Sequence, residues 1–161
     1  MTQEDKELLL KDVCERLPHG VKVAFFNEDL TYHSEPKTLT GIECINNLNY
    51  SRLEDEDGNT TIVEFVKPYL FPLSSMTEEQ KRELLTLTGY EARCEESCGF
   101  DSWGFYVNIV GEYKYEDNQE SIILYPDDIG IDWYNKNHFD YRGLIEKGLA
   151  LDATGLNIYK S

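Results

Sequence analysis

The sequence predicts an α+β fold, with a mainly antiparallel sheet built from hairpins and packed by an N-terminal helix, a middle helix and a short C-terminal helix. Two observations predict this class. The strand patterns come in hairpin pairs, and the helix patterns stand apart from them instead of alternating with single strands as in a parallel sheet. The chain has 161 residues without a repeat or a Pro- or Ser-rich linker, so we expect a single domain over residues 1–161.

The first predicted element is a helix over Gln3–Arg16. Thr2 can cap its amino end, because a Thr hydroxyl accepts a hydrogen bond from a backbone N–H of the first turn. Pro18 and Gly20 should end the helix. Its apolar residues recur at helical spacing and should face the core; they are Leu10, Val13, Cys14 and Leu17.

A short buried strand is predicted over Val21–Phe26, and a further strand falls somewhere within Leu39–Leu53. The hairpin partner of that second strand is Thr60–Val66, which is rich in β-branched residues. The loop between them contains Asp57-Gly58, a pair that supplies positive φ at low cost. We expect the acidic run Glu54–Asp57 to be a solvated loop tip.

The next segment, Lys67–Leu73, is predicted to be an irregular surface connection because it holds two prolines, which restrict the backbone around them. A middle helix should begin near Thr77. The Thr77 hydroxyl and the Gln80 side chain can form a capping box, in which each accepts a hydrogen bond from a backbone N–H at the helix start. Gly89 is placed to end this helix.

The clearest strand pattern covers Gly104–Glu116, where apolar and polar residues alternate between two faces. Asp117-Asn118 should turn the chain so that Ile122–Tyr125 returns beside it. A short helix is predicted over Asp132–His138, with Asp132 as its cap.

The composition of the chain indicates which classes of partner and which cellular compartment to expect. The 31 Asp and Glu against 15 Lys and Arg give a formal charge of −16, which opposes binding to a phosphate backbone, so we do not expect a nucleic-acid partner. No apolar run is long enough for a membrane span, and the N-terminus lacks a signal-peptide pattern. We therefore expect no membrane association and a cytoplasmic location, with the four cysteines as free thiols.

The sequence contains no motif that indicates a metal site or a known catalytic site. Cys94 and Cys98 are the closest cysteine pair, but structural zinc sites usually add a second pair, so ordinary thiols are expected and zinc is the alternative. The chain lacks the phosphate loops and nucleophile motifs of common enzymes. We expect no cofactor and no metal and assign no catalytic residue. The densest set of hard-metal ligands is interpreted as caps, turns and solvated ends; it comprises Asp127, Asp128, Asp132, His138 and Asp140.

The stretch Trp133–Ala153 differs from the rest of the chain, because it is balanced in charge, aromatic and broken by two glycines. We expect any specific site to lie here. The residues that we predict to bind a partner are His138, Asp140, Tyr141 and Arg142.

Three segments resemble a group of small proteins without an established function that Bacteroides-type gut bacteria and their phages encode. They are Trp133–Ala153, in which His138–Leu151 is the most specific part, the opening helix Glu4–Pro18 with the following Gly20–Val23, and Tyr69–Glu79. Residues 91–128 lie outside the resemblance. The resemblance implies an origin in bacteria, phages or mobile elements and, by analogy, a small binding protein that acts on a host component.

The leading functional hypothesis is therefore a small acidic non-enzymatic protein-binding module, with an unidentified protein as its partner. A mimic of nucleic acid is a narrower form of this hypothesis and requires carboxylates spaced along one face. The alternative is a small metal-assisted hydrolase-type enzyme that uses Asp127, Asp128, His138 and Asp140.

Overall fold

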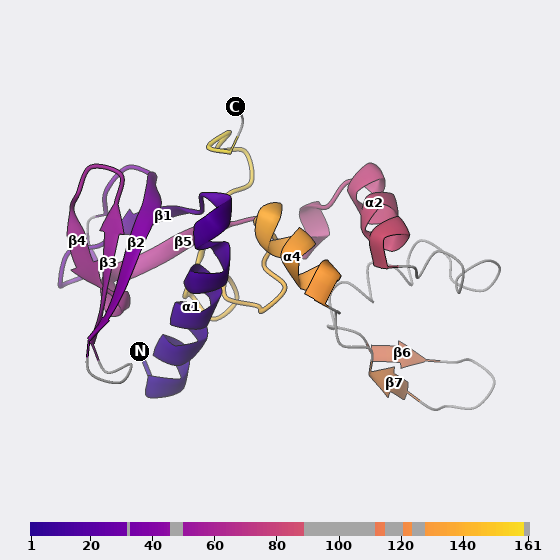
Figure 1. The fold of residues 1–161 in the computed structure, drawn as a ribbon, viewed down its shortest axis with the longest axis horizontal. Helices are drawn as coiled ribbons and strands as arrows, with labels where there is room; N and C mark the ends of the chain where they lie inside the picture. Colours follow the sequence, from indigo (N-terminus) through magenta and orange to yellow (C-terminus); the bar gives the residue numbers. More distant parts are fainter. Residues whose placement is uncertain (32, 46–49, 89–111, 115–120, 124–127, 160–161) are drawn as a thin grey trace. The chain divides into compact units, whose positions relative to one another are not determined.

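The computed structural model describes residues 1–31, 33–45, 50–88, 112–114, 121–123 and 128–159. The chain divides into two compact units, each described by itself: unit 1 comprises Met1–Leu70 with Gly143–Ser161, and unit 2 comprises Phe71–Arg142. The helices and strands confirm the predicted α+β class with a mainly antiparallel sheet (Figure 1). A single domain over residues 1–161 stays a prediction.

Unit 1 is built on a six-stranded sheet in the order β4-β3-β2-β1-β5-β8. Neighbouring strands are antiparallel except for β5 and β8, which pair in parallel. The strands are β1 Lys22–Phe25, β2 Lys37–Ile45, β3 Tyr50–Asp55, β4 Thr60–Ile62, β5 Val66–Leu70 and β8 Leu151–Asp152.

The helix α1 spans Gln3–Arg16 as predicted. Thr2 and Asp5 form its capping box, with the Thr2 hydroxyl 3.1 Å from the Asp5 N–H and the Asp5 carboxylate 3.0 Å from the Thr2 N–H. The prediction for its buried face was wrong at Cys14, which is exposed. Burial is centred on a neighbouring stripe that includes two charged residues and therefore does not look apolar in the sequence: Leu9, Leu10, Asp12, Val13 and Arg16.

Two strands, β2 and β3, occupy the region where the sequence predicted one. They pair antiparallel, and Glu43 lies opposite Arg52 in their ladder. Because each strand carries a charged residue at this pair, neither shows an uninterrupted apolar alternation. The hairpin that follows is confirmed, since β3 pairs with β4 and Gly58 has φ +80° in the turn. The strand predicted over Thr60–Val66 ends early, because a 3₁₀ turn, η2, follows at Val63–Phe65.

The prediction that Lys67–Leu73 is irregular was wrong, because β5 pairs with β1 on one side and β8 on the other. Pro68 lies opposite Val23. The Phe26 N–H donates to the Phe65 carbonyl at 2.7 Å, and backbone groups along a strand alternate between its two neighbours. The backbone groups of Phe65 therefore face β1. Pro68 lies three residues further along the chain, an odd number of steps, so an N–H at that position would face away from β1. Proline therefore interrupts no bond of the β1–β5 ladder.

The core of unit 1 lies between α1 and the sheet. The C-terminal segment from Gly143 onward contributes to it and runs into β8 beside β5. The core side chains come from α1, the strands and this segment: Leu9, Leu10, Val13, Val21, Val23, Leu39, Leu53, Val63, Val66, Leu70, Leu144, Leu149 and Ala150.

Unit 2 contains η3 Leu73–Ser75, α2 Glu78–Thr88, the hairpin strands β6 Glu112–Lys114 and β7 Ser121–Ile123, and α4 Asp128–Lys136. The predicted capping box of α2 is confirmed, because the Thr77 N–H donates to the Gln80 side chain at 2.9 Å and the Gln80 N–H donates to the Thr77 hydroxyl at 3.2 Å. β6 and β7 pair antiparallel, in agreement with the predicted hairpin. The rest of the predicted strand over Gly104–Glu116, its turn and Gly89 lie outside the described residues.

The C-terminal helix starts earlier than predicted. Asp132 lies inside α4, which begins at Asp128, so Asp132 is not its cap. Gly130 falls in the first turn, and its low helix propensity explains why the sequence pattern indicated a later start. A separate core in unit 2 packs around this helix; its buried members are Met76, Leu84, Trp133, Tyr134, Phe139 and Tyr141.

Candidate functional site

His138 occupies the position after α4 that glycine usually fills. Its φ is +58°, in the left-handed region that L-residues disfavour by about 1–2 kcal/mol. The His138 N–H donates to the Asn135 carbonyl at 3.2 Å, and the Phe139 N–H donates to the Tyr134 carbonyl at 3.0 Å. These two bonds form a Schellman motif, which ends a helix by satisfying its last carbonyls.

The residues on either side of Phe139 are held to Phe71. The Phe71 N–H donates to the His138 carbonyl at 2.9 Å, and the Asp140 N–H donates to the Phe71 carbonyl at 2.8 Å. The rings of Phe71 and Phe139 lie 6.1 Å apart. Phe139 forms an isolated parallel bridge with Phe71, so this part of the predicted site is fixed through its backbone.

Aromatic rings surround this segment. Phe139 stacks on Trp133, with ring centres 5.6 Å apart and planes within 6°, and Tyr134 stacks on Tyr141 at 5.2 Å. The Arg142 guanidinium lies 4.4 Å from the centre of the Tyr141 ring, within the range of a cation–π contact.

The four predicted binding residues are therefore close together but unequally accessible. His138, Asp140 and Tyr141 are each only 7% exposed, whereas Arg142 is half-buried. A rigid partner can reach little of the first three side chains. Their role in binding stays a prediction, and the geometry accounts for them as parts of the unit 2 core and its helix end.

The proposed metal ligands do not form a site among the described residues. No three His, Cys, Asp or Glu side chains there converge as metal ligands. Asp127, Cys94 and Cys98 lie outside the described residues, and Asp128 is described only through its backbone in α4. The hydrolase alternative stays a prediction.

A second candidate site, which the sequence did not reveal, is the loop Asn27–Thr31 after β1; we call it the Leu30 loop. Leu30 is 50% exposed and has φ +60°, although a bulky side chain rarely adopts this backbone conformation. The Leu30 N–H donates to the Asn27 carbonyl at 3.0 Å, which closes the turn. The Asp29 carboxylate accepts bonds from the Thr31 N–H at 3.0 Å and from the Thr31 hydroxyl at 2.6 Å.

The base of the Leu30 loop is also ordered. Phe26 and His33 form an isolated antiparallel bridge with their rings 5.0 Å apart, and the Lys67 ammonium lies 5.3 Å from the centre of the Phe26 ring. The Ser34 N–H donates to the Phe25 carbonyl at 2.8 Å, while the Phe25 N–H donates to the Ser34 hydroxyl at 3.1 Å. Asn and Asp favour turns, but no sequence rule places a leucine at positive φ, so the pattern gave no signal for this loop.

The acidic turn Asp55–Asn59 only partly fits the predicted solvated tip. Asp55 is 1% exposed and organises the turn from inside. Its carboxylate accepts the N–H groups of Asp57 and Asn59, each at 2.9 Å, and its carbonyl accepts the Gly58 N–H at 3.0 Å. The prediction was wrong for Asp55. Its carboxylate is buried because hydrogen bonds from the N–H groups of the turn take the place of hydrogen bonds from water.

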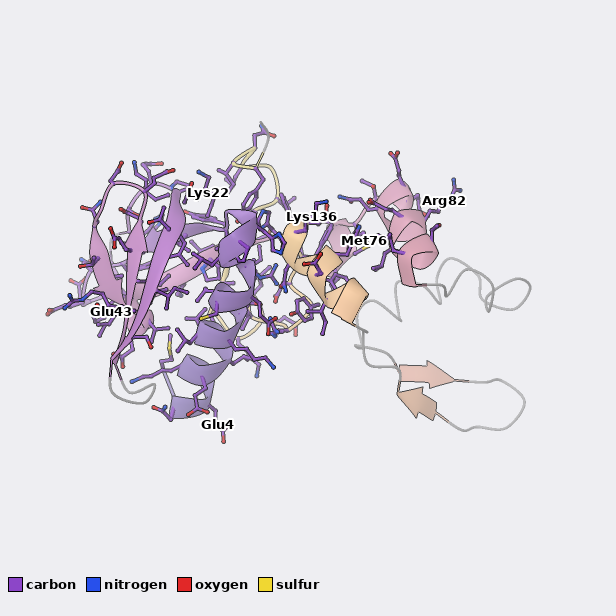
Figure 2. All side chains as sticks on the ribbon, viewed as in Figure 1. Glu4, Lys22, Glu43, Met76, Arg82 and Lys136 are labelled. Carbon is purple, nitrogen blue, oxygen red and sulfur yellow. The ribbon has the colours of Figure 1, made fainter. Side chains whose placement is uncertain are left out.

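The exposed carboxylates of this turn contact cations of β1 and β2. The Lys37 ammonium lies 2.7 Å from the Asp57 carboxylate, which raises the pKa of Lys37. The Thr38 hydroxyl donates to Glu56 at 2.7 Å and lowers the pKa of that carboxyl. Lys22, labelled in Figure 2, donates to Thr38 at 2.6 Å and lies 3.7 Å from Glu56. The turn is therefore partly neutralised within unit 1.

Unit 1 also contains buried polar groups that the sequence analysis missed. Asp12 and Arg16 form an ion pair on α1 with both side chains fully buried. The Tyr159 hydroxyl accepts the Lys22 N–H at 2.9 Å and donates to the Tyr69 carbonyl at 2.7 Å, so it bridges β1 and β5. The four-residue spacing of Asp12 and Arg16 predicts an ion pair on one face of the helix. Such pairs are ordinarily expected on the solvent-exposed face, so the spacing does not indicate burial.

Comparison with known proteins identifies no relative. No family model matches the chain, and no curated protein or solved structure matches it. Among the helices of the described residues, none has the length and apolar character that crossing a membrane requires.

Proposed function

We propose that the protein is a small acidic non-enzymatic protein-binding module and that it contacts its partner through the Leu30 loop. The observation that carries the proposal is Leu30 itself, an exposed leucine held at positive φ. An origin in bacteria, phages or mobile elements and a cytoplasmic location belong to the same proposal. They rest on the sequence resemblance and composition described above.

The energetics of Leu30 support a role in binding. A left-handed backbone costs a non-glycine residue about 1–2 kcal/mol, and an exposed leucine gains little from burial in the free protein. Backbone strain of this kind persists where the surrounding structure imposes it, and it clusters at sites of function. A partner that covered the exposed half of the side chain would recover transfer free energy that the free protein does not realise.

The ordering of the loop supports the same role. The Asn27 carbonyl, the Asp29 carboxylate and the Thr31 hydroxyl form hydrogen bonds across the tip. A loop that is already ordered loses less conformational entropy on binding than a flexible loop does. The backbone that carries Leu30 is thus held by hydrogen bonds of the loop.

The test compares capture from a bacterial lysate by three forms of the full chain. Leu30→Ser removes the proposed anchor, and Leu156→Ser is a matched control because Leu156 is 48% exposed in the same unit. We expect the wild type and Leu156→Ser to retain the same protein at low salt and Leu30→Ser to lose it. Circular dichroism checks that each variant is folded. If no protein is retained reproducibly by the wild type, the proposed function is wrong.

A further inference from the structure

We infer that the Tyr159 side chain is a wedge that holds the β1–β5 ladder open by one hydrogen-bond position, and that the two strands close on each other when Tyr159 leaves. The segment Thr154–Tyr159, which we call the C-terminal strap, then decides by its docking between two arrangements of Lys22 and Tyr69. Both arrangements lie within unit 1, and neither involves the Leu30 loop.

The register of β1 and β5 identifies the position that is held open. The ladder ends at the pair Val23 and Pro68, one position short of Lys22 and Tyr69. Hydrogen-bonded positions alternate along an antiparallel pair, and the Phe26 N–H bonds to the chain of β5. Lys22 lies four residues before Phe26, an even number of steps. Its N–H therefore also faces β5, opposite the Tyr69 carbonyl.

The Tyr159 hydroxyl occupies this position. The Lys22 N–H donates to it at 2.9 Å, and the hydroxyl donates to the Tyr69 carbonyl at 2.7 Å. Two backbone groups that would bond to each other in a continued ladder thus bond to one side-chain oxygen. Burial raises the pKa of Tyr159, so the hydroxyl keeps the proton that it donates to Tyr69.

The strap is anchored before it begins. Ala153 is fully buried, and its N–H donates to the Leu70 carbonyl at 2.8 Å. The residues from Thr154 to Asn157 are exposed, and the chain becomes half-buried again at Tyr159. The Ala153 anchor does not involve Tyr159, so it can persist when the tyrosine leaves the ladder.

The two arrangements satisfy the same backbone groups. With Tyr159 docked, its hydroxyl bridges Lys22 and Tyr69; with Tyr159 released, a direct bond from the Lys22 N–H to the Tyr69 carbonyl replaces the bridge. Neither arrangement leaves a buried N–H or carbonyl unpaired, which would be the main cost of the change. Burial of the Tyr159 ring favours docking, and the conformational entropy of the exposed strap residues favours release.

The experiment compares Tyr159→Phe with Tyr159→Gly in the full chain. The NMR scalar coupling across a hydrogen bond, measured between the Lys22 nitrogen and the Tyr69 carbonyl carbon, detects the direct bond. We expect the coupling in Tyr159→Gly but not in the wild type or in Tyr159→Phe, whose ring stays between the strands. Amide exchange at Lys22 should be about tenfold slower in Tyr159→Gly than in Tyr159→Phe, because only glycine lets the direct bond form.

Leu156→Gly is the matched control. It also makes the strap more flexible, at a position that is 48% exposed, but it keeps Tyr159. We expect no coupling between Lys22 and Tyr69 in this variant and an exchange rate at Lys22 within about twofold of the wild type. Ala24 lies opposite Lys67 within the ladder, and the coupling of this pair is the internal reference in every form.

The remaining outcomes overturn the inference. A coupling between Lys22 and Tyr69 in the wild type would show that Tyr159 is not a wedge, and this measurement needs no variant. If Tyr159→Gly lacks the coupling, or exchanges at Lys22 as fast as Tyr159→Phe, the strands do not close. Tyr159→Ala repeats the comparison with a second small residue, and it decides the result if circular dichroism shows that Tyr159→Gly is unfolded.

Discussion

Arg16 and Asp12 form a two-point ion pair one helical turn apart on α1, and both side chains are fully buried. The Arg16 Nε lies 2.8 Å from one carboxylate oxygen of Asp12, and Nη2 lies 3.1 Å from the other. Two charges have therefore left water together, and removing either one leaves the other charge buried without this ion pair.

Removing one partner should be strongly destabilising. We expect Asp12→Ala to lower the free energy of unfolding by about 3–5 kcal/mol, because it leaves the Arg16 charge buried without its carboxylate. Urea denaturation measures the change. The double variant Asp12→Leu/Arg16→Met should recover most of the loss, and Lys11→Ala, at an exposed neighbouring position, should change stability little. A small loss for Asp12→Ala would mean that the pair does not stabilise unit 1.

Tyr159→Phe tests the bridge between β1 and β5. The variant keeps the ring but leaves the Lys22 N–H and the Tyr69 carbonyl without the hydroxyl. We expect a loss of about 1–3 kcal/mol in unfolding free energy, the range for a buried polar group that loses its hydrogen-bond partner. Amide hydrogen exchange should be faster at Lys22. Unchanged exchange there would contradict the bridge.

The same tyrosine predicts a pH dependence. Burial raises the pKa of Tyr159, so the folded state holds this proton more tightly than the unfolded state does. The stabilisation is present in full below the unfolded pKa, about 10, and is lost as pH rises above it. Urea denaturation at about pH 8 and about pH 11 should show a larger loss for the wild type than for Tyr159→Phe. Equal losses would exclude Tyr159 as a source of the dependence.

His138→Gly tests the strained end of α4. Glycine adopts φ near +58° without the penalty that other residues incur. We therefore expect His138→Gly to exceed His138→Ala in unfolding free energy by about 1 kcal/mol. Thermal unfolding of the two variants gives the comparison. If alanine proves equal to glycine, the Schellman geometry at His138 is not maintained in solution.

Leu30→Gly separates stability from binding. The substitution relieves the left-handed strain, and the greater freedom of glycine in the unfolded chain offsets part of that gain. We expect the unfolding free energy to rise by up to about 1 kcal/mol and partner capture to be lost. Urea denaturation and the lysate capture provide the two measurements. A marked fall in stability would show that Leu30 contributes to the fold of the free protein.

Several elements could be predicted from the sequence because their signals are local. The bounds of α1, the capping roles of Thr2 and Gln80 and the turn at Gly58 follow from residue types within a few positions. The sequence predicted only part of what the structure shows for the binding segment. The pattern identified His138–Arg142 as unusual, but it could not tell that His138, Asp140 and Tyr141 would be buried.

The α+β class and the helix and turn signals were predictable because propensity and capping depend on residues close together in the chain, and the acidic charge follows from composition. Three features were not predictable: the joint burial of Asp12 and Arg16, the place of Pro68 in a strand paired on both sides, and the exposure of Leu30 at positive φ. These outcomes depend on which distant segments pack or pair with each residue. A charged pair is buried when the surrounding packing excludes water, and a strained loop persists when hydrogen bonds and flanking strands hold it.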